Sequence, residues 1–441
     1  MATDRLDKNS IDKNFGDLHP PLSRSEALIE ADRCYFCFDA PCTIACPTGI
    51  DIPGFIQKIR SDNLRGSAQT ILQENIMGGM CARVCPTEVL CEEACVRNAH
   101  EDKPVEIGLL QRYATDPVYS AGTRLFERAE PSGKKVAIVG GGPAGLSCAH
   151  RLAMLGHDVV VFNRDDKPGG LNEYGIAAYK TVDGFAQREV EWILAIGGIE
   201  VKSSVELGRD ITLTDLREQF DAVFLAIGLG GVNALDFDDR GLSGVENAVD
   251  FIAELRQARD RSKLPVGHNV VVIGGGMTAI DIAVQSKRLG AENVDILYRR
   301  GPHQMGASQF EQDLARTNGV NIHLWAAPIH LLGDGHVSGI KMEQTSLDAD
   351  GRLQMTGTTM ALDADIVFRA IGQKLDDDIV ESELAELKLQ DGKIAVDESQ
   401  TTSLENVWAG GDCATGGDDL TVTAVQQGKI AAIAIDHALR S

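Results

Sequence analysis

The sequence predicts an α/β fold with a helical domain at its N-terminus, on the basis of three observations. Eight of the ten cysteines lie between Cys34 and Cys95. A strand, a glycine-rich turn and a helix follow one another from Lys134, and the same pattern returns from Asn269. Strands that alternate with helices in this way build parallel sheets covered by helices.

The first glycine-rich turn lies between two predicted strands. Val136–Val139 reads as a buried strand, Gly140-Gly-Gly-Pro-Ala-Gly145 opens a helix that runs to Leu155, and the next strand is 159–162. In this context the G-x-G-x-x-G motif places the pyrophosphate of a dinucleotide at the N-terminus of the helix. We therefore expect Gly140, Gly142 and Gly145 to bind a dinucleotide in a Rossmann-like domain.

The second glycine-rich turn repeats the arrangement. The strand 269–273 leads into Gly274-Gly-Gly276-Met-Thr-Ala279, a helix to Leu289 and the strand 294–298. Two such turns predict two dinucleotides, one held permanently and one exchanging. Gly274, Gly276 and Ala279 are the residues expected to contact the second.

The cysteines have the spacing of an iron–sulfur protein. The first four follow C-x2-C-x4-C-x3-C-P from Cys34, one gap longer than the bacterial ferredoxin run, whose fourth cysteine binds the other cluster. Cys46 is therefore expected to cross over to the second half of the block, which begins at Cys81. Structural zinc is the alternative, although zinc ribbons use paired C-x2-C hooks and only Cys34 and Cys37 form one. A disulfide framework is disfavoured in a reducing cytosol.

Composition excludes several functions. The formal charge of −23 argues against nucleic-acid and anionic-membrane binding, and 43% hydrophobic with 24% charged residues describes an ordinary globular chain. No apolar run is long enough to span a membrane, and residues 1–24 lack the apolar core of a signal peptide. The sequence thus predicts a cytoplasmic protein. Residues 1–24, with Pro20-Pro21, are expected to form an extended arm, 104–115 a helix and 116–133 a polar linker.

The order of the parts resembles the two-dinucleotide-binding flavoprotein reductases. Two strands end in glycine at Gly228 and Gly372, and Asn406-Val-Trp-Ala-Gly-Gly-Asp412 delivers an acid. The resemblance implies that the first turn binds FAD, that an NAD(P) domain is inserted into the FAD domain, and that Asp412 contacts the ribityl–phosphate region. It also implies that Gly170 and Leu171 line the flavin. The expected domains are 1–132 (iron–sulfur domain with the arm), 133–247 with 363–441 (FAD domain), and 248–362 (NAD(P) domain).

With the cysteine block in front, the chain resembles the glutamate synthase small-subunit superfamily, and within it the electron-input part of bacterial dihydropyrimidine dehydrogenase. The runs from Asp39 to Pro53 and from Cys81 to Cys91 look like that branch, and most specific is Ile107-Gly-Leu-Leu-Gln111-Arg-Tyr-Ala-Thr. In the pyrimidine enzymes a glutamine here replaces a cysteine as a cluster ligand. The resemblance implies one [4Fe-4S] cluster on Cys34, Cys37, Cys42 and Cys95, and a second on Cys46, Cys85, Cys91 and Gln111. Cys81 is left without a cluster.

Two residues depart from this family pattern, and an arginine pair bears on the choice of coenzyme. Asn163 stands where the family has the Glu that binds the FAD ribose, so FAD is expected to be held less tightly. Met277 replaces an Asn, and nothing in the sequence explains the change. Arg299 and Arg300 follow the second NAD(P) strand, where an Arg favours the 2′-phosphate of NADPH, whereas the bacterial pyrimidine enzymes use NADH. Cys148 and Cys413 are expected to pack in the core.

The function that follows is electron input. Hydride from NAD(P)H is a two-electron unit and clusters take single electrons, so a flavin must stand between them. The expected partner is an FMN- and iron–sulfur-bearing catalytic subunit that reduces uracil or thymine to the 5,6-dihydropyrimidine. The alternatives are a glutamate synthase small subunit or related reductase, and a non-catalytic nucleotide sensor with a zinc-stabilised head.

Overall fold

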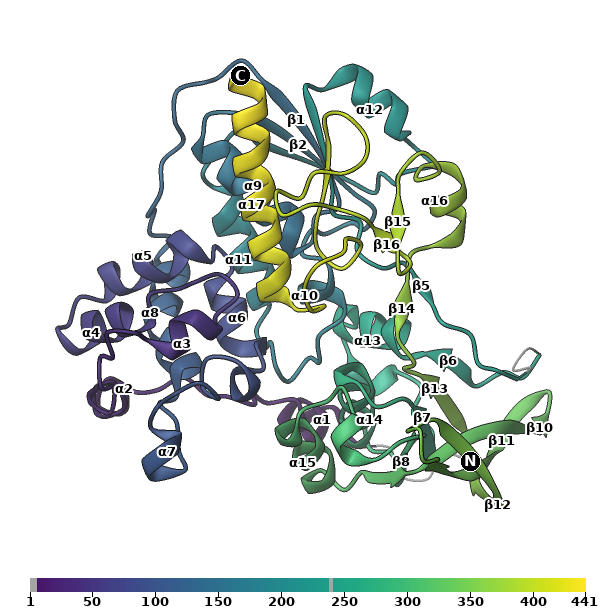
Figure 1. The fold of residues 1–441 in the computed structure, drawn as a ribbon. Coiled ribbons are helices and arrows are strands. Elements are labelled where there is room, and N and C mark those ends of the chain that lie inside the picture. Colours follow the sequence, from purple (N-terminus) through teal and green to yellow (C-terminus); the bar gives the residue numbers. More distant parts are fainter. Residues whose placement is uncertain (1–5, 238–240) are drawn as a thin grey trace. The chain divides into compact units, whose positions relative to one another are not determined.

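The computed structural model describes residues 6–237 and 241–441, which divide into two compact units. One unit comprises residues 19–173, 183–231 and 374–441. The other comprises 6–18, 174–182 and the described part of 232–373. Figure 1 shows the elements that make up each unit. The cysteine-rich domain and the FAD domain fall in the larger unit with residues 19–24 of the expected arm, and residues 6–18 of that arm fall in the smaller unit.

The cysteine-rich part of the larger unit is helical, as expected. Its longer helices are α2 (Arg24–Asp32), α4 (Ile52–Arg60), α5 (Leu64–Glu74), α6 (Gly78–Val84) and α8 (Ile107–Ala121). Three short helices lie between them: α3 (Pro41–Ala45), which contains Cys42, η1 (Thr87–Val89) and α7 (Asn98–Glu101). Ile52, Phe55, Ile56 and Ile59 of α4 recur at helical spacing and are all at most 2% exposed, so they form the centre of this core.

Local sequence explains where these helices begin. Ser23 and Glu26 form a capping box at the start of α2, and the Asp51 side chain accepts the Gly54 N–H at the start of α4. The prediction that a linker begins at residue 116 is wrong, because helix α8 continues through Pro117 to Ala121. Val118 and Tyr119 are buried, and this packing outweighs the hydrogen bond that the proline cannot make.

The FAD-type part of the larger unit contains a five-stranded parallel sheet of order β17-β4-β1-β2-β3. The strands are β1 (Lys135–Val139), β2 (Asp158–Asn163), β3 (Ile199–Ser203), β4 (Ala222–Leu225) and β17 (Val407–Ala409). Helices α9 (Pro143–Met154) and α17 (Thr421–Arg440) pack closely against each other, and the remaining helices are α10 (Leu171–Tyr174), α11 (Phe185–Leu194), α12 (Leu213–Gln219) and α16 (Asp377–Ser382). The close approach needs Gly428, since a Cβ there would lie 2.1 Å from the Ala144 carbonyl oxygen.

The smaller unit has its own five-stranded parallel sheet of order β6-β13-β7-β8-β9. Its strands are β6 (Val245–Asn247), β7 (Asn269–Ile273), β8 (Asn293–Tyr298), β9 (Asn321–Leu324) and β13 (Ile366–Arg369). The helices are α13 (Ala248–Gln257), α14 (Met277–Leu289) and α15 (Gln309–Thr317). An antiparallel sheet of β10 (Ala326–Asp334), β11 (His336–Leu347) and β12 (Leu353–Asp363) completes the unit. Two parallel sheets with helices confirm the predicted fold class.

The N-terminal arm is not extended throughout, which corrects the expectation for residues 1–24. Helix α1 (Lys8–Asn14) begins at Asp7, whose side chain accepts the Ser10 N–H. Ile11 and Phe15 lie on one face, are 3% exposed and join the core of the smaller unit. Residues 1–5 of the expected arm lie outside the described residues.

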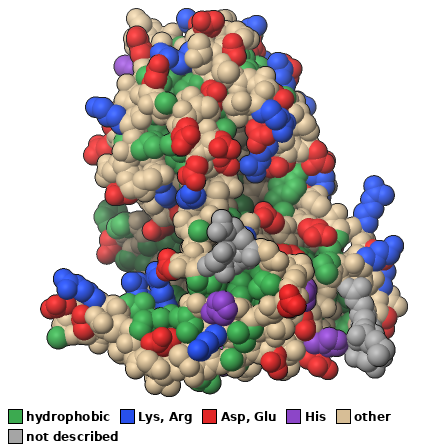
Figure 2. Space-filling model, turned by 90° about the vertical axis from the view of Figure 1, so that its right-hand side faces the viewer, with side chains coloured by type: hydrophobic (Ala, Val, Ile, Leu, Met, Phe, Trp, Pro, Cys, Tyr) green, Lys and Arg blue, Asp and Glu red, His purple; other side chains and the backbone are tan. Residues whose placement is uncertain are grey.

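The surface carries mixed charge, and the described helices do not cross membranes. Figure 2 shows acidic and basic side chains interspersed over one face rather than collected into a patch of one sign. Within residues 6–237 and 241–441, no helix has both the length and the hydropathy of a membrane span.

Candidate functional site

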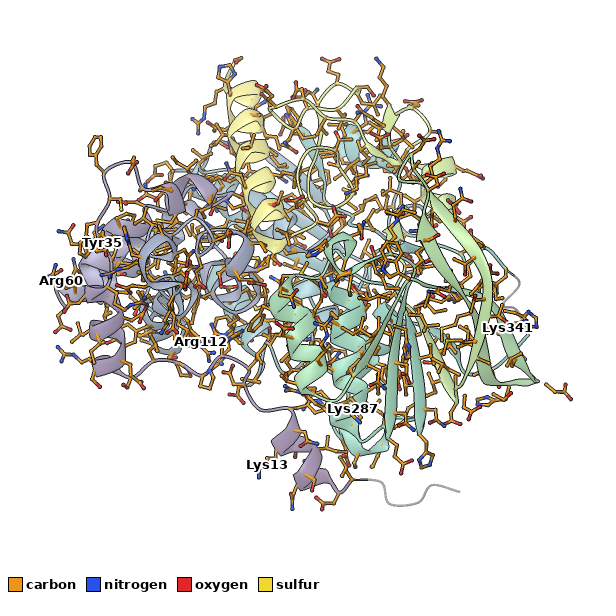
Figure 3. The ribbon with its side chains drawn as sticks, turned by 60° about the horizontal axis from the view of Figure 1, so that its bottom comes forward. Lys13, Tyr35, Arg60, Arg112, Lys287 and Lys341 are labelled. Atoms are coloured by element: carbon orange, nitrogen blue, oxygen red, sulfur yellow. The ribbon has the colours of Figure 1, made fainter. Side chains whose placement is uncertain are left out.

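The first group of cysteines gathers four thiols from three segments. The pKa of the Cys34 thiol is raised by burial and by the neighbouring thiols of Cys37 and Cys95. Burial, with Cys34 and Cys95 nearby, raises the pKa of Cys42 to about 11. The structure therefore brings together Cys34, Cys37, Cys42 and Cys95, which is the set expected for one cluster. Tyr35, in this segment, lies in the helical region in Figure 3, and the Arg97 guanidinium lies over its ring at 3.9 Å.

The second group contains the cysteine that was expected to cross over. The pKa of Cys85 is raised well above its usual value, first by a hydrogen bond with Cys81, then by burial and by the nearby thiols of Cys91 and Cys46. Burial raises the pKa of Cys91 too, with Glu92, Cys46 and Cys42 of the first group adding to the effect. Cys46 thus lies with the cysteines of the second half of the block, although its sequence neighbours lie with the first.

The donors of the cysteine block are free thiols, the usual ligands of iron–sulfur clusters. All ten cysteines are free thiols. Across the described residues, no three His, Cys, Asp or Glu side chains converge as they would around a single metal ion. Each thiolate of a [4Fe-4S] cluster binds a different iron, so its ligands stand further apart than those of one ion. Apolar side chains of α4 and α8 pack against Cys34, Cys42, Cys46, Cys91 and Cys95.

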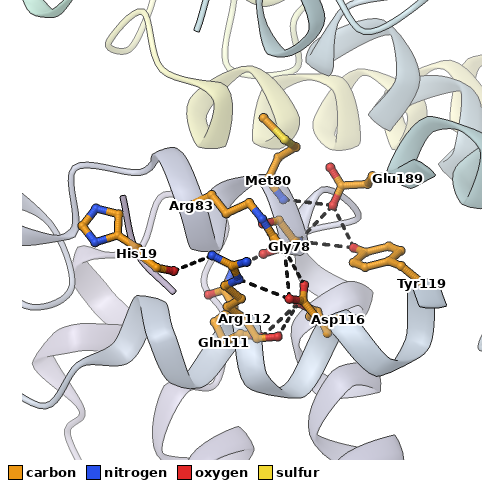
Figure 4. Close-up of polar contacts among 11 residues, drawn as sticks. His19, Gly78, Met80, Arg83, Gln111, Arg112, Asp116, Tyr119 and Glu189 are labelled. Carbon is orange, nitrogen blue, oxygen red and sulfur yellow. Dashed lines mark hydrogen bonds and ion pairs between the residues drawn. The ribbon is translucent and has the colours of Figure 1, made fainter. Parts of the chain in front are cut away.

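Gln111 lies on α8 and contacts the helix that carries Cys81. Its side chain is 7% exposed, and its Nε2 donates to the Gly78 carbonyl oxygen at 2.6 Å (Figure 4). The hydrogen bond fixes the amide nitrogen and leaves Oε1 as the only atom of the side chain able to bind iron. Sequence spacing gave no sign of this residue, which only the family resemblance indicated.

A buried glutamate of the FAD-type fold holds the first turn of α6. Glu189 of α11 is fully buried, and its Oε1 accepts the N–H groups of Gly79 at 2.9 Å and Met80 at 3.1 Å and the Tyr119 hydroxyl at 2.8 Å (Figure 4). The carboxylate thereby accepts amide N–H groups at the helix start that have no acceptor within the helix. Its other oxygen, Oε2, is buried and makes no hydrogen bond, and burial raises the pKa of Glu189 to about 7. Sequence patterns did not reveal this residue.

An arginine pair completes the polar layer between α6 and α8. The Arg83 guanidinium donates to both carboxylate oxygens of Asp116 at 2.8 and 2.9 Å, and Arg112 donates to the same carboxylate and to the His19 carbonyl (Figure 4). Arg83 also lies over the Phe185 ring at 3.5 Å. The two helices that bear Cys81 and Gln111 are therefore fixed relative to each other by charged groups with matched partners.

The first glycine turn has the backbone that a pyrophosphate needs. A Cβ on Gly140, whose φ is +105°, would lie 2.2 Å from the Ala226 carbonyl oxygen, and one on Gly145 would lie 1.9 Å from the Gly140 oxygen. Gly142 differs, because the nearest atom to a Cβ there is 3.8 Å away, the Cα of Gly170. Gly140 and Gly145 shape the turn, and Gly142 leaves open the space in front of α9, where a phosphate would approach.

Asn163 holds the first glycine turn through its side-chain amide. Its side chain is 5% exposed; Oδ1 accepts the Gly141 N–H at 3.0 Å, and Nδ2 donates to the carbonyl oxygens of Asp165 and Lys167. A Glu could not make the two donations. Asn163 therefore holds the glycine turn to the loop after β2. A contact with the FAD ribose would have to use the remaining lone pair of Oδ1.

The other FAD-side residues lie near the same turn. Gly169 donates to the Gly141 carbonyl at 2.7 Å, and the Gly170 Cα faces Gly142 as described above. Leu171 is 42% exposed at the start of α10. Asp412 follows β17, and burial raises its pKa to about 6, with Asp419 adding to the effect and Lys393 opposing it. A buried carboxylate of this kind is suited to accept hydrogen bonds from the hydroxyl groups of a ligand.

The two cysteines outside the block pack in the core, as expected. Cys148 and Cys413 are both fully buried, and the Cys413 Sγ contacts the carbonyl oxygens of Leu225 and Gly410. Neither thiol is disulfide-bonded.

The second glycine turn repeats the geometry of the first. Gly274, with φ of +145°, would place a Cβ 2.1 Å from the Ala370 carbonyl oxygen. Nothing lies within 4 Å of a Cβ on Gly276, and Ala279 is fully buried in the first turn of α14. The turn therefore presents the same open backbone before a helix that a dinucleotide needs. Met277 begins α14, and the structure gives no reason for methionine there.

Arg299 and Arg300 follow β8 with exposed side chains. Within the described residues, neither guanidinium forms an ion pair or a hydrogen bond. The carbonyl oxygens of Arg299 and Arg300 accept from the Thr345 hydroxyl and the Trp325 N–H. Both guanidinium groups are thus available to an anionic ligand.

A buried ion triad holds the segment 174–182 in the smaller unit. The Lys180 Nζ lies 2.7 Å from Asp281 Oδ1 and 2.6 Å from Glu311 Oε1, and the three side chains are at most 9% exposed. Burial lowers the pKa of Lys180, but the two carboxylates outweigh it and raise the pKa overall. Asp281 and Glu311 come from α14 and α15, so the segment is fixed to the helix that follows the second glycine turn.

Comparison with known proteins identifies the two sequence-defined parts. Residues 134–428 match the family model described as pyridine nucleotide-disulphide oxidoreductase. The chain belongs to the pyridine nucleotide-disulphide oxidoreductase family. Residues 11–123 match the model of dihydropyrimidine dehydrogenase domain II, 4Fe-4S cluster. This family member is therefore an oxidoreductase that uses NAD(P)H, FAD and a 4Fe-4S domain, which contradicts the alternative of a non-catalytic sensor.

Relatives of this family member cover nearly its whole length. The NAD-dependent dihydropyrimidine dehydrogenase subunit PreT of Escherichia coli (strain K12) is 36% identical over 423 residues, covering 96% of this chain and 97% of that protein. The glutamate synthase [NADPH] small chain of the same organism is 36% identical over 444 residues, covering 95% of this chain and 92% of that protein. Both are named as parts of larger enzymes.

Solved structures support the fold of the flavoprotein part. Mycobacterium tuberculosis FprA in complex with NADPH superimposes with a TM-score of 0.59 at 19% identity, covering 70% of this chain and 85% of that one. Thioredoxin reductase of T. acidophilum superimposes with a TM-score of 0.54 at 20% identity, and the match covers 70% of this chain and 100% of that one. These likenesses confirm the expected two-dinucleotide-binding architecture.

Proposed function

We propose that this chain is the electron-input subunit of a dihydropyrimidine dehydrogenase, and that its FMN-bearing partner reduces uracil or thymine at the 5,6 double bond. With FAD and two [4Fe-4S] clusters bound, the chain would accept hydride from NAD(P)H and deliver single electrons to that partner. The proposal rests on the family group in which a 4Fe-4S domain precedes the flavoprotein fold. Gln111 favours the pyrimidine branch, by resemblance.

The chain's own residues have distinct parts in this scheme. Gly142 leaves room for the FAD pyrophosphate at the N-terminus of α9. Asp412 would accept hydrogen bonds from the hydroxyl groups of the FAD ribityl chain. Gly276 leaves equivalent room for NAD(P)H at α14. The cluster ligands would be the two groups of four: Cys34, Cys37, Cys42 and Cys95; Cys46, Cys85, Cys91 and Gln111.

The test is dependence on the partner. We expect the purified chain to oxidise NAD(P)H with artificial dyes but to leave uracil unchanged. Addition of an FMN-bearing dihydropyrimidine dehydrogenase catalytic subunit should then permit NAD(P)H-dependent formation of dihydrouracil. Steady reduction of uracil by the chain alone would contradict the proposal.

A glutamate synthase small subunit is the second candidate, because that relative matches at the same 36% identity as PreT. Sequence identity alone does not separate the two branches. Formation of glutamate from 2-oxoglutarate and glutamine, only when a large amidotransferase subunit is added, would select this candidate.

For the coenzyme we expect NADH, since the PreT relatives are named as NAD-dependent. The exposed guanidinium groups of Arg299 and Arg300 would still allow the 2′-phosphate of NADPH to bind. Arg299→Ala should then lower kcat/KM for NADPH about tenfold, about 1.4 kcal/mol, and leave that for NADH nearly unchanged. Steady-state kinetics with both coenzymes checks this. A tenfold preference of the unmodified chain for NADPH, lost in Arg299→Ala, would show that the expected choice is wrong.

A further inference from the structure

Cys81 is the cysteine of the block for which the proposed function has no use. It is 3% exposed and lies on α6, and its carbonyl oxygen accepts the N–H of Cys85, a proposed ligand of the second cluster, at 3.0 Å. Its position in the fold therefore differs from that of the other two non-ligand cysteines, Cys148 and Cys413, which pack in the flavoprotein core away from other thiols.

Helical geometry places Cys81 between the two proposed ligands that contact α6. Gly78, Cys81 and Cys85 stand at i, i+3 and i+7, so they follow one stripe along the helix. Gln111 reaches this stripe at its first position, through the hydrogen bond from its Nε2 to the Gly78 carbonyl oxygen. Cys85 ends the stripe, and its N–H donates to the Cys81 carbonyl at 3.0 Å. The Cys81 thiol thus lies one turn from the point where Gln111 is held and one turn from Cys85.

The hold on Gln111 also bears on which donor binds iron. A glutamine amide oxygen is a neutral ligand, whereas a thiolate carries a charge and is the usual ligand of iron–sulfur clusters. Gln111 can compete with the nearby thiol because its side chain is oriented by the Gly78 carbonyl and buried. Without that amide, the Cys81 thiol is a donor on the same stripe, one turn along the helix.

We propose that Cys81 is a reserve ligand of the second cluster, able to bind the iron that Gln111 occupies when the amide is removed. The proposal rests on the proposed function, because it requires a cluster on Cys46, Cys85 and Cys91. In the exchange, the Cys81 thiol gives its proton to solvent and its sulfur forms a bond to the iron left open by Gln111. Electrons are not transferred in this exchange.

The test compares single and double variants of the full chain, with iron content and cluster potential as readouts. The unmodified chain should contain about eight iron atoms. Gln111→Ala should keep about eight and shift the potential of one cluster downward, since a thiolate adds negative charge. Cys81→Ala should also keep about eight. The double variant should keep about four, on the cluster of the Cys34 group.

Controls separate ligand loss from misfolding. Cys148→Ala removes a buried cysteine far along the chain and should keep all the iron. Retained FAD and the four remaining irons would show that the double variant is folded. The proposal would be overturned if the single variant Gln111→Ala lost half the iron. It would also be overturned if the double variant kept all of it. Loss of a cluster in Cys81→Ala alone would also overturn it, by making Cys81 the resident ligand. An unmodified chain without iron would instead contradict the proposed function.

Discussion

Replacing Lys180 by methionine is expected to destabilise the smaller unit by about 3–5 kcal/mol, the usual cost of removing one partner from a buried ion pair. Asp281 and Glu311 each lie within 2.7 Å of the Lys180 ammonium, and both would be left buried without it. The measurement is the unfolding temperature of this unit by calorimetry on the full chain.

The matched control is Lys341→Met, which changes an exposed lysine of β11 in the same unit (Figure 3). It should shift stability by less than about 0.5 kcal/mol. An unfolding temperature equal to that of Lys341→Met would mean that the triad does not stabilise the segment 174–182.

Gly142→Ala is expected to weaken FAD binding on the order of 100-fold, equal to about 2.8 kcal/mol, without unfolding the flavin-free chain. A Cβ at this position meets no atom closer than 3.8 Å, so the turn itself tolerates alanine. The methyl group would occupy space that a pyrophosphate needs at the N-terminus of α9. Flavin retained after gel filtration and the melting temperature of the apoprotein check the two halves of this expectation.

Two further glycine variants serve as controls. Gly276→Ala should keep FAD and impair use of NAD(P)H, because the same open position occurs at the second turn. Gly145→Ala should lose both FAD and stability, since its Cβ would lie 1.9 Å from a carbonyl oxygen. Normal FAD retention in Gly142→Ala would contradict the placement of the pyrophosphate.

The sequence predicted the parts whose signals are local. Both glycine turns, the strands that flank them and the final helix follow from glycine spacing and apolar runs, and the structure places them within a few residues of expectation. Cys46 was placed with the second group because the ferredoxin spacing carries that information along the chain. Each of these features depends on neighbours in sequence.

The remaining features depend on contacts between distant segments. Glu189 accepts an N–H of α6 from a residue 110 positions away in the sequence, and Lys180 pairs with Glu311, 131 positions away. No local sequence pattern predicts either contact. Asn163 is a substitution whose effect is visible only when the glycine turn and the loop after β2 are seen together. Helix α1 was the avoidable error: Asp7 as a cap, with Ile11 and Phe15 one turn apart, is a readable helix signal.

Glu189 limits how far the cysteine-rich region can be treated as a transferable module. The N–H groups of Gly79 and Met80 have their acceptor in α11, and the Thr48 and Glu74 carbonyl oxygens accept the Lys429 ammonium of α17. A fragment that contained the iron–sulfur domain alone would expose these N–H groups and carbonyl oxygens to water. Helix α6 would then lose the hydrogen bonds from its first turn to Glu189. A chimaera that grafts this head onto another flavoprotein must therefore carry a glutamate and a lysine at matching sites on the acceptor's helices.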